Sequence, residues 1–245
     1  MSRSIAKSDE KRGIILPEMS EELAYFLGIL AGDGSIQIRR EKHDYCIKCV
    51  GNPKDEQEFY VTIIAPLIQK LFGLLVAPKY YDRGTTFGFQ FSSKSIVQFL
   101  IDLGVPSGQK YDSLHIPLCV KKNTELITAY LRGLFDTDGC VCFKRLYREY
   151  PYYPVISFSS RNAKFVAEVV VVLRFYGVSV YAYYDRIFLD LRVRSAFTQI
   201  SQISINGKKN LYLWMSIIGF SNPKHLKKIQ NWEKGAVACH PNSEG

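Results

Sequence analysis

Two nine-residue stretches of this chain repeat each other 105 residues apart. Residues 26–34 have the sequence FLGILAGDG, and residues 131–139 have the sequence LRGLFDTDG. Each is an apolar helical run with small residues four positions apart, which lie on one helix face and let two backbones approach closely. Each run ends in Asp-Gly, so Asp33 and Asp138 stand where the helix macrodipole is already negative. Two carboxylates brought together there repel each other unless a cation neutralises them, so the repeat predicts a divalent-metal site at a pseudo-twofold axis.

The repetition extends beyond these two stretches. Residues 79–83, KYYDR, are echoed by residues 182–186, AYYDR, and residues 108–110, GQK, are echoed by residues 207–209, GKK. Matched landmarks in the same order indicate two copies of one unit. Each copy has the pattern α-β-β-α-β-β-α, which predicts an α+β fold with two four-stranded antiparallel sheets in tandem. The expected domains are residues 15–118 and 119–222 for the two copies, 223–235 for a basic helix and 236–245 for a tail.

Hydrophobic periodicity places the elements of each copy. In the first copy we expect helices over about 20–32, 55–73 and 96–103, the second bent by Pro66, and strands over 35–40, 44–51, 77–83 and 86–92. In the second copy we expect a motif helix capped by Asn123 or Thr124, a helix over 162–177, and strands from about 140 and over 155–159, 178–184 and 187–193.

One face of each predicted sheet is polar. The side chains expected there are Gln37, Arg39, Lys48, Tyr81, Arg83 and Gln90 in the first copy and Cys142, Lys144, Arg192 and Arg194 in the second. The solvated face of any α+β protein carries similar residues. However, the chain has a formal net charge of +9, which favours a polyanionic partner. Arg and Lys suit guanine and Gln suits adenine in the major groove of DNA, so we interpret this face as a DNA-binding surface.

Phosphodiester hydrolysis needs an activated water and stabilisation of the charge on phosphate, and divalent metals held by carboxylates supply both. Asp33 and Asp138 are the carboxylates common to the two copies, whereas Asp136 is matched by Ala31 and is interpreted as a packing or capping residue. Lys110 and Lys209, at matched places expected after the third helix of each copy, are predicted to assist catalysis electrostatically. Asn52 and Ser159, at the ends of the second strands, are predicted to orient water.

On these residues the chain resembles the LAGLIDADG homing endonucleases of the single-chain, two-motif kind. The resemblance covers about residues 20–220 and implies a saddle of two sheets over the DNA major groove. It also implies double-strand cleavage leaving short 3′ overhangs, with Mg²⁺ bridging Asp33, Asp138 and the scissile phosphates. Further implied metal ligands are the carbonyl groups of Gly32 and Thr137. Mn²⁺ is expected to substitute, and Ca²⁺ to support binding without cleavage.

Because the two copies differ at the DNA-facing positions, the expected partner is a long, asymmetric duplex bound by a monomer without an obligate protein partner. An intron-encoded, free-standing enzyme is favoured over a splicing element. The alternatives are an intron RNA maturase and a non-cleaving DNA-binding regulator on the same fold, although both motif aspartates are present. No apolar run approaches the ~18 residues that span a bilayer. With no secretory signal and six cysteines interpreted as reduced thiols, an intracellular, cytoplasmic protein is expected.

Overall fold

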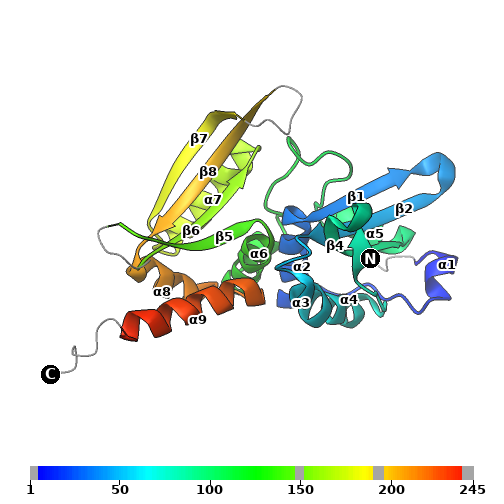
Figure 1. The fold of residues 1–245 in the computed structure, drawn as a ribbon. Coiled ribbons are helices and arrows are strands. Elements are labelled where there is room, and N and C mark those ends of the chain that lie inside the picture. The colour runs from blue at the N-terminus through cyan, green and yellow to red at the C-terminus, as the bar shows by residue number, and fades with distance from the viewer. Residues whose placement is uncertain (1–4, 147–151, 190–195, 239–245) are drawn as a thin grey trace. The chain divides into compact units, whose positions relative to one another are not determined.

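The chain folds as two compact α+β units, Met1–Thr137 and Asp138–Gly245, each with a four-stranded antiparallel sheet (Figure 1). The structure is a computed structural model that describes residues 5–146, 152–189 and 196–238. The predicted fold class, two such sheets in tandem, is confirmed. The two compact units divide after residue 137, at the end of the second motif helix. The predicted boundaries, 15–118 and 119–222, mark the two copies of the duplicated sequence and stay a prediction.

Unit 1 contains sheet A, in the strand order β1-β2-β4-β3. Its strands are β1 (Gly34–Arg39), β2 (Asp44–Gly51), β3 (Lys79–Tyr81) and β4 (Thr86–Ser92). Its helices are α1 (Lys7–Glu10), α2 (Glu21–Gly32), α3 (Gln57–Phe59), α4 (Ala65–Phe72), α5 (Lys94–Asp102) and α6 (Thr124–Thr137), with short helical turns η1 (Arg40–Lys42), η2 (Tyr60–Ile64), η3 (Asp82–Gly84) and η4 (Val120–Lys122).

The two motif helices, α2 and α6, pack against each other within unit 1. A β-carbon on Gly28 would overlap the Tyr130 carbonyl oxygen, and one on Gly133 would overlap the Tyr25 carbonyl oxygen. The close backbone approach predicted from these small residues is therefore present. Asp136 is fully buried, and its Oδ2 accepts a hydrogen bond of 2.7 Å from the Tyr25 hydroxyl. Its side chain thus joins the two helices, as the packing interpretation expected.

The helix predicted over 55–73 is continuous from residue 57 to residue 72 and contains a π-helical turn. α3 is followed by the single π-helical turn η2 and then by α4, whose first turn contains Pro66. Proline lacks a backbone N–H and is tolerated at this position of a helix. Gly73 ends α4 with φ +68°, a conformation that other residues rarely adopt.

Unit 2 contains sheet B, in the matching order β5-β6-β8-β7. Its elements are β5 (Gly139–Lys144), β6 (Tyr153–Ser160), α7 (Ala163–Phe175), β7 (Val180–Leu189), β8 (Phe197–Asn206), α8 (Lys208–Ile217) and α9 (Pro223–Ala238). Helix α7 covers one face of β6, β7 and β8 (Figure 1). Helix α9 lies along β5, where the Trp232 ring stacks on Phe143 at a centroid distance of 5.0 Å. Among the described residues, none of the helices is both long and apolar enough to cross a bilayer.

The last two strands predicted for the second copy, 178–184 and 187–193, are wrong. β7 is one strand with a bulge between Tyr183 and Arg186, and its partner β8 begins only at Phe197. Asp185, in the repeated YYDR segment, has φ +52°, and the matching Asp82 has φ +51°. The Asp of the shared sequence thus has the same left-handed conformation in both units. In unit 1 Arg83 and Gly84 continue with positive φ and end β3, whereas in unit 2 Arg186 is paired again and the strand is only bulged.

Candidate functional site

Asp33 is the first residue after α2, and its side chain is half-buried in unit 1. Its Oδ2 accepts a hydrogen bond of 3.3 Å from the Tyr60 hydroxyl, which lies 3.6 Å from the Cys49 Sγ. Burial, with a smaller contribution from the Asp33 charge, raises the pKa of Cys49 and of Tyr60 well above their ordinary values. Both groups therefore stay protonated at neutral pH, and Tyr60 remains a hydrogen-bond donor to the Asp33 carboxylate.

Lys110 reaches the same end of α2 from the segment after α5. Its Nζ donates to the carbonyl oxygens of Leu30 at 3.2 Å, of Ala31 at 3.0 Å and of Gly32. These are carbonyl groups at the negative end of the helix dipole, so the ammonium group offsets both the dipole and the nearby carboxylate. The structure thus brings together three residues predicted for the site, Asp33, Gly32 and Lys110.

Asn52 follows β2 and lies beside a buried acid that sequence reasoning missed. Glu56 is 3% exposed, and its Oε2 accepts a hydrogen bond of 2.6 Å from the Asn52 backbone N–H. A β-carbon on Gly51 would overlap this oxygen and would lie 3.1 Å from Asp33 Oδ2. Two carboxylates therefore approach the same glycine. Nothing in the sequence marked Glu56, because an acid in a loop of polar residues normally faces solvent.

The strand register identifies the unit 2 counterparts of these residues. Gly34 pairs with Cys49 in sheet A, and Gly139 pairs with Phe158 in sheet B. Three residues further along, Asn52 is therefore matched by Arg161 and not by Ser159. Ser159 pairs instead with Gln202 and is exposed. The guanidinium of Arg161 donates to the Thr198 hydroxyl at 3.0 and 3.3 Å. Asp138, between α6 and β5, is exposed.

The predicted placement of Lys209 after the third helix is wrong. Lys209 is the second residue of α8, which is itself the third helix of the repeat, and its side chain is exposed. Lys110 lies eight residues after the end of α5, at 102, and Lys224 lies seven residues after the end of α8, at 217. By this count Lys224, the second residue of α9, is the residue of unit 2 that corresponds to Lys110. The alternation of residues 201–206, with Ile203 and Ile205 on one face, was the missed signal, because recognising β8 would have moved the third helix to 208–217.

The outer face of sheet A, away from the buried residues, carries the predicted DNA-binding side chains. The register places Gln37, Arg39, Lys48, Tyr81 and Gln90 on this one face. Arg39 pairs with Asp44 at 3.2 Å, and Lys48 pairs with Asp82 at 2.9 Å. Arg83 differs from the prediction, because it lies in the turn η3 with φ +58° and not in a strand.

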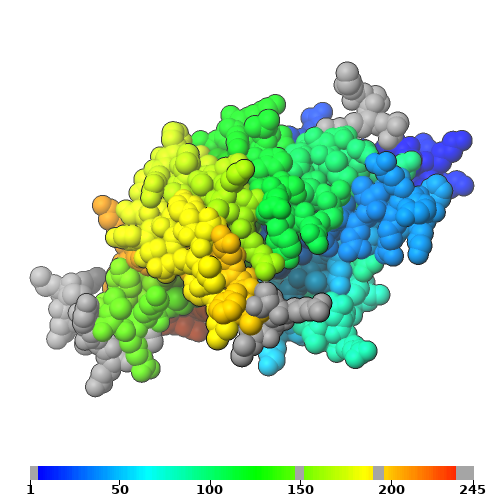
Figure 2. Space-filling view, turned by 90° about the horizontal axis from the view of Figure 1, so that it is seen from above, coloured from blue at the N-terminus to red at the C-terminus, as the bar shows by residue number. Residues whose placement is uncertain are grey.

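The outer face of sheet B is less charged. Cys142 occupies the position of Gln37 and Lys144 that of Arg39, as predicted. Arg192 and Arg194 lie outside the described residues. At the far end of this face, Phe188 is 40% exposed, whereas the exposed side chains of Ile187, Leu189 and Phe197 share the opposite face with Ile203 by register. β7, yellow in Figure 2, lies at the surface of unit 2.

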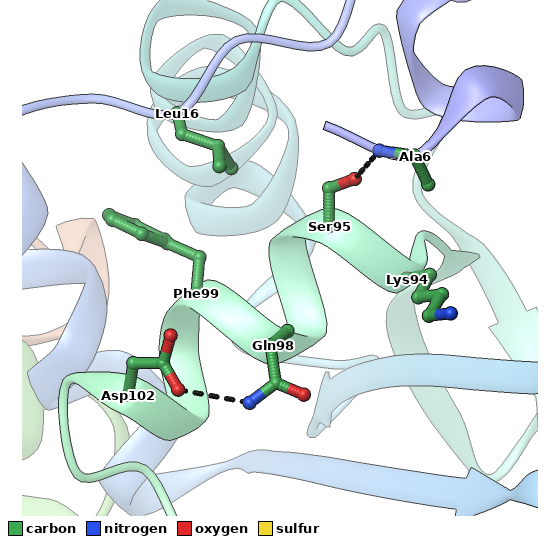
Figure 3. Close-up of a pocket in the computed structure, with 7 residues that line it drawn as sticks. All are labelled: Ala6, Leu16, Lys94, Ser95, Gln98, Phe99 and Asp102. Atoms are coloured by element: carbon green, nitrogen blue, oxygen red, sulfur yellow. Dashed lines mark hydrogen bonds between the residues drawn. The ribbon is translucent and has the colours of Figure 1, made fainter. Parts of the chain in front are cut away.

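One pocket in unit 1 involves none of these residues. It has a volume of about 300 Å³ and lies between the N-terminal segment and α5 (Figure 3). Four of its polar groups pair with one another: Ser95 Oγ accepts from the Ala6 N–H at 2.8 Å, and the Gln98 amide donates to Asp102 at 2.9 Å. A catalytic role for this pocket has no support.

The few acidic side chains near the end of α2 suit a metal ion that takes most of its ligands from water and substrate. Within the part of the chain that the structure describes, there is no group of three or more His, Cys, Asp or Glu residues able to hold a metal ion. Mg²⁺ commonly binds one or two carboxylates and completes its shell with water and substrate phosphates. Asp33 and the neighbouring Gly32 carbonyl fit that pattern, and the ammonium group of Lys110 already lies at this carbonyl.

Comparison with known proteins gives matches to both sequence and fold. Residues 125–219 match the LAGLIDADG-like domain family. The Replication factor C small subunit of Methanocaldococcus jannaschii is 26% identical over 213 residues, 86% of this chain. A probable translation initiation factor IF-2 of Thermococcus kodakarensis is 26% identical over 209 residues, 84% of this chain. The chain spans only 10% and 15% of these two relatives, so the likeness concerns one segment of each.

Solved structures match over most of the chain. The homing endonuclease I-DmoI in complex with DNA and Ca has a TM-score of 0.58 at 16% identity, covering 86% of this chain and 97% of that one. A lysine-to-alanine mutant of I-SmaMI has a TM-score of 0.57 at 11% identity, covering 91% and 93%. I-DmoI or its variants have also been solved with DNA and Mn or in the presence of Mg. At these identities the likeness concerns the fold.

Proposed function

We propose that this chain, which belongs to the LAGLIDADG family and has the fold of its homing endonucleases, is a site-specific, divalent-metal-dependent endonuclease of double-stranded DNA. The observation that carries the proposal is the end of α2. There a carboxylate, a half-buried lysine and the last helix carbonyl groups converge just before β1, a strand of the sheet whose outer face carries Arg, Lys and Gln. A structural protein has no need to place a carboxylate at the negative end of a helix dipole.

Asp33 and Asp138 are the proposed metal ligands, with the carbonyl groups of Gly32 and Thr137 as further donors. Mg²⁺ is the proposed ion, because its preference for a few carboxylates plus water and phosphate suits this donor set. When bound, it would supply an activated water and offset the charge that develops on the scissile phosphate. Tyr60 holds the Asp33 carboxylate in place through its hydroxyl group.

Lys110 is the proposed electrostatic helper in unit 1, and Lys224 replaces Lys209 as its proposed counterpart in unit 2. An ammonium group beside a scissile phosphate stabilises the negative charge of the transition state. Lys110 is held for this task, because its Nζ contacts three backbone carbonyl groups and its side chain is half-buried. Asn52 is proposed to orient water in unit 1. Its amide NH₂ group has no hydrogen-bond partner among the described residues, whereas its Oδ1 accepts from the Lys54 N–H at 2.9 Å.

The outer faces of the two sheets are the proposed DNA-reading surfaces. In the free protein Arg39 and Lys48, both partly exposed, form ion pairs with Asp44 and Asp82. Exposed ion pairs of this kind contribute little stability, so a guanine edge or a phosphate can replace the aspartate at small cost. Short 3′ overhangs, a long asymmetric target and binding as a monomer are the finer features that we propose.

A selection experiment tests the proposal. The full chain is incubated with a plasmid library carrying random inserts and Mg²⁺, and linearised molecules are captured and sequenced. We expect one family of long sites, cut on both strands, with no cutting in EDTA and with binding but no cutting in Ca²⁺. Recovery of no cut site in Mg²⁺ or Mn²⁺, together with tight binding to a defined duplex, would favour the non-cleaving regulator. Tight binding to a structured intron RNA alone would favour the maturase.

A further inference from the structure

The loop after β2 contains a buried carboxylate that the proposed reaction does not yet use. Glu56 is 3% exposed, and two hydrogen bonds close its loop. Its backbone N–H donates to the Asn52 carbonyl at 3.1 Å, and its Oε2 accepts from the Asn52 N–H at 2.6 Å. The position of Asn52 in space is thus set by Glu56.

The same carboxylate faces Asp33 across a glycine. A β-carbon at Gly51 would overlap Glu56 Oε2 and would lie 3.1 Å from Asp33 Oδ2. Gly51 is therefore needed for space, because any other residue would push the Glu56 carboxylate away from the Asn52 N–H. The turn at Gly51 and Asn52 therefore packs against Asp33.

Helix formation alone does not require an acid at this place. Burying a carboxylate costs free energy unless it is well hydrogen-bonded. In unit 2 the equivalent connection is shorter, and the residue before α7 is Asn162, whose side chain accepts from the Phe165 N–H at 2.9 Å. A neutral side chain thus begins the matching helix there. The carboxylate of Glu56 is a feature of unit 1 alone.

We propose that Glu56 is a positioning residue of the unit 1 half of the site: it holds the Gly51–Asn52 turn against Asp33, so that Asn52 orients water for one DNA strand only. This inference rests on the proposed endonuclease function and deepens it. Glu56 acts through the Asn52 backbone and touches neither metal nor DNA. Because unit 2 has Arg161 and Asn162 at the matching positions, loss of Glu56 must affect the two strands unequally.

The test measures nicking and linearisation of a supercoiled plasmid that carries the selected target. Glu56→Ala should bind the target normally and make the first nick at about the wild-type rate. We expect it to linearise the plasmid about 10- to 100-fold more slowly, the loss that follows from a small misplacement of a reacting group. Every nick should map to the same strand. Glu56→Gln, whose side-chain carbonyl can still accept from the Asn52 N–H, should restore most of the rate.

Two further variants separate positioning from folding. Gly51→Ala displaces the Glu56 carboxylate without removing it and should reproduce the strand bias, and adding it to Glu56→Ala should cause no further loss. Asp55→Ala, which removes an exposed acid from the same loop, is the matched control and should cut both strands normally.

Equal slowing of both strands by Glu56→Ala, with a lowered thermal midpoint and no rescue by Gln, would show a purely structural role and overturn the proposal. Unchanged cutting by both Glu56→Ala and Gly51→Ala would overturn it too. If the wild-type protein makes no cut, the proposed endonuclease function is wrong, and the role of Glu56 is wrong with it. That result differs from the two above, in which the wild-type protein cuts.

Discussion

Sheet A and sheet B have the same strand order and an equivalent register, but their outer faces differ in chemistry. Four pairs of equivalent positions on the outer faces show this difference. Sheet A carries Gln37, Arg39, Lys48 and Gln90 there, and sheet B carries Cys142, Lys144, Ser157 and Ser204. Two amides and two cations in one unit are thus matched by a thiol, one cation and two hydroxyl groups in the other.

The difference shows which part of the duplicated unit has stayed constant. The inner faces remain apolar in both sheets: Ile36, Ile47 and Phe89 in sheet A and Val141, Ile156 and Ile203 in sheet B are at most 1% exposed. A buried face tolerates few side chains, whereas the outer face is constrained only by what it contacts. Two such faces cannot recognise identical half-sites, which is why an asymmetric duplex is the expected target.

The largest effect is expected where the two units are alike, at the motif aspartates. Asp33→Asn and Asp138→Asn should each lower double-strand cleavage by roughly 10³-fold or more, because each removes a charged metal ligand and the catalysis that depends on it. Binding in Ca²⁺, measured by gel shift on the selected duplex, should persist. Full cleavage by either variant would show that the repeated motifs are not equivalent in function.

Lysine variants test which residue of unit 2 corresponds to Lys110: Lys224, from its position after α8, or Lys209, from the repeated sequence. Lys110→Met and Lys224→Met should slow cleavage by about 10²–10³-fold, as for a lost electrostatic stabiliser. Lys209→Met, at the exposed start of α8, is the matched control and should cut at the wild-type rate. Single-turnover rates at saturating protein give the comparison. A slow Lys209 variant beside a normal Lys224 variant would reverse the assignment.

The charged face of sheet A should determine base preference in only one half-site. Arg39→Ala is expected to cost about 1–3 kcal/mol per lost bidentate base contact and to relax specificity at the contacted position. Lys144→Ala, at the matching place in sheet B, should act on the other half-site. Competition binding with singly substituted duplexes locates each effect. Relaxation at both ends of the target by Arg39→Ala would contradict the division of labour between the sheets.

The smallest effect is expected at the apolar end of sheet B. Phe188 is exposed on its outer face, where an apolar side chain can contact the C5-methyl group of thymine. Replacing thymine by uracil in the half-site that Lys144→Ala affects should weaken binding by about fourfold per contacted methyl group, from roughly 0.8 kcal/mol. The same replacement in the Arg39 half-site should change little. Equal losses in both half-sites would remove this difference between the faces.

Much of the site could be predicted because the repeat is local in sequence. The glycines at 28 and 133 predicted the close packing of α2 and α6, and strand alternation placed Gln37 and Arg39 on the correct face. The errors arose where a local pattern depended on a longer context. The repeated YYDR segment suggested two strands of equal length in both copies, but the turn at Asp185 only bulges β7, and β8 was displaced to 197–206.

Glu56 illustrates what sequence could not show. Its carboxylate lies against Gly51 and close to Asp33 because the loop 52–56 folds back on itself. No rule of residue spacing predicts that these three residues come together. Lys224 was missed for another reason. Residues 108–110, GQK, do resemble residues 207–209, GKK. However, β8 was not recognised as a strand, so Lys209 was assigned to the segment after the third helix, whereas it lies at the start of that helix.

The central claim is that one chain cuts one asymmetric site with two different halves. The most direct test is sedimentation of the complex with the selected duplex in Ca²⁺, followed by addition of Mg²⁺ and strand-resolved mapping of the cuts. We predict one chain per duplex, a non-palindromic target and a cut on each strand. Two chains per duplex on a palindromic target, or no cut after Mg²⁺ is added, would contradict the claim.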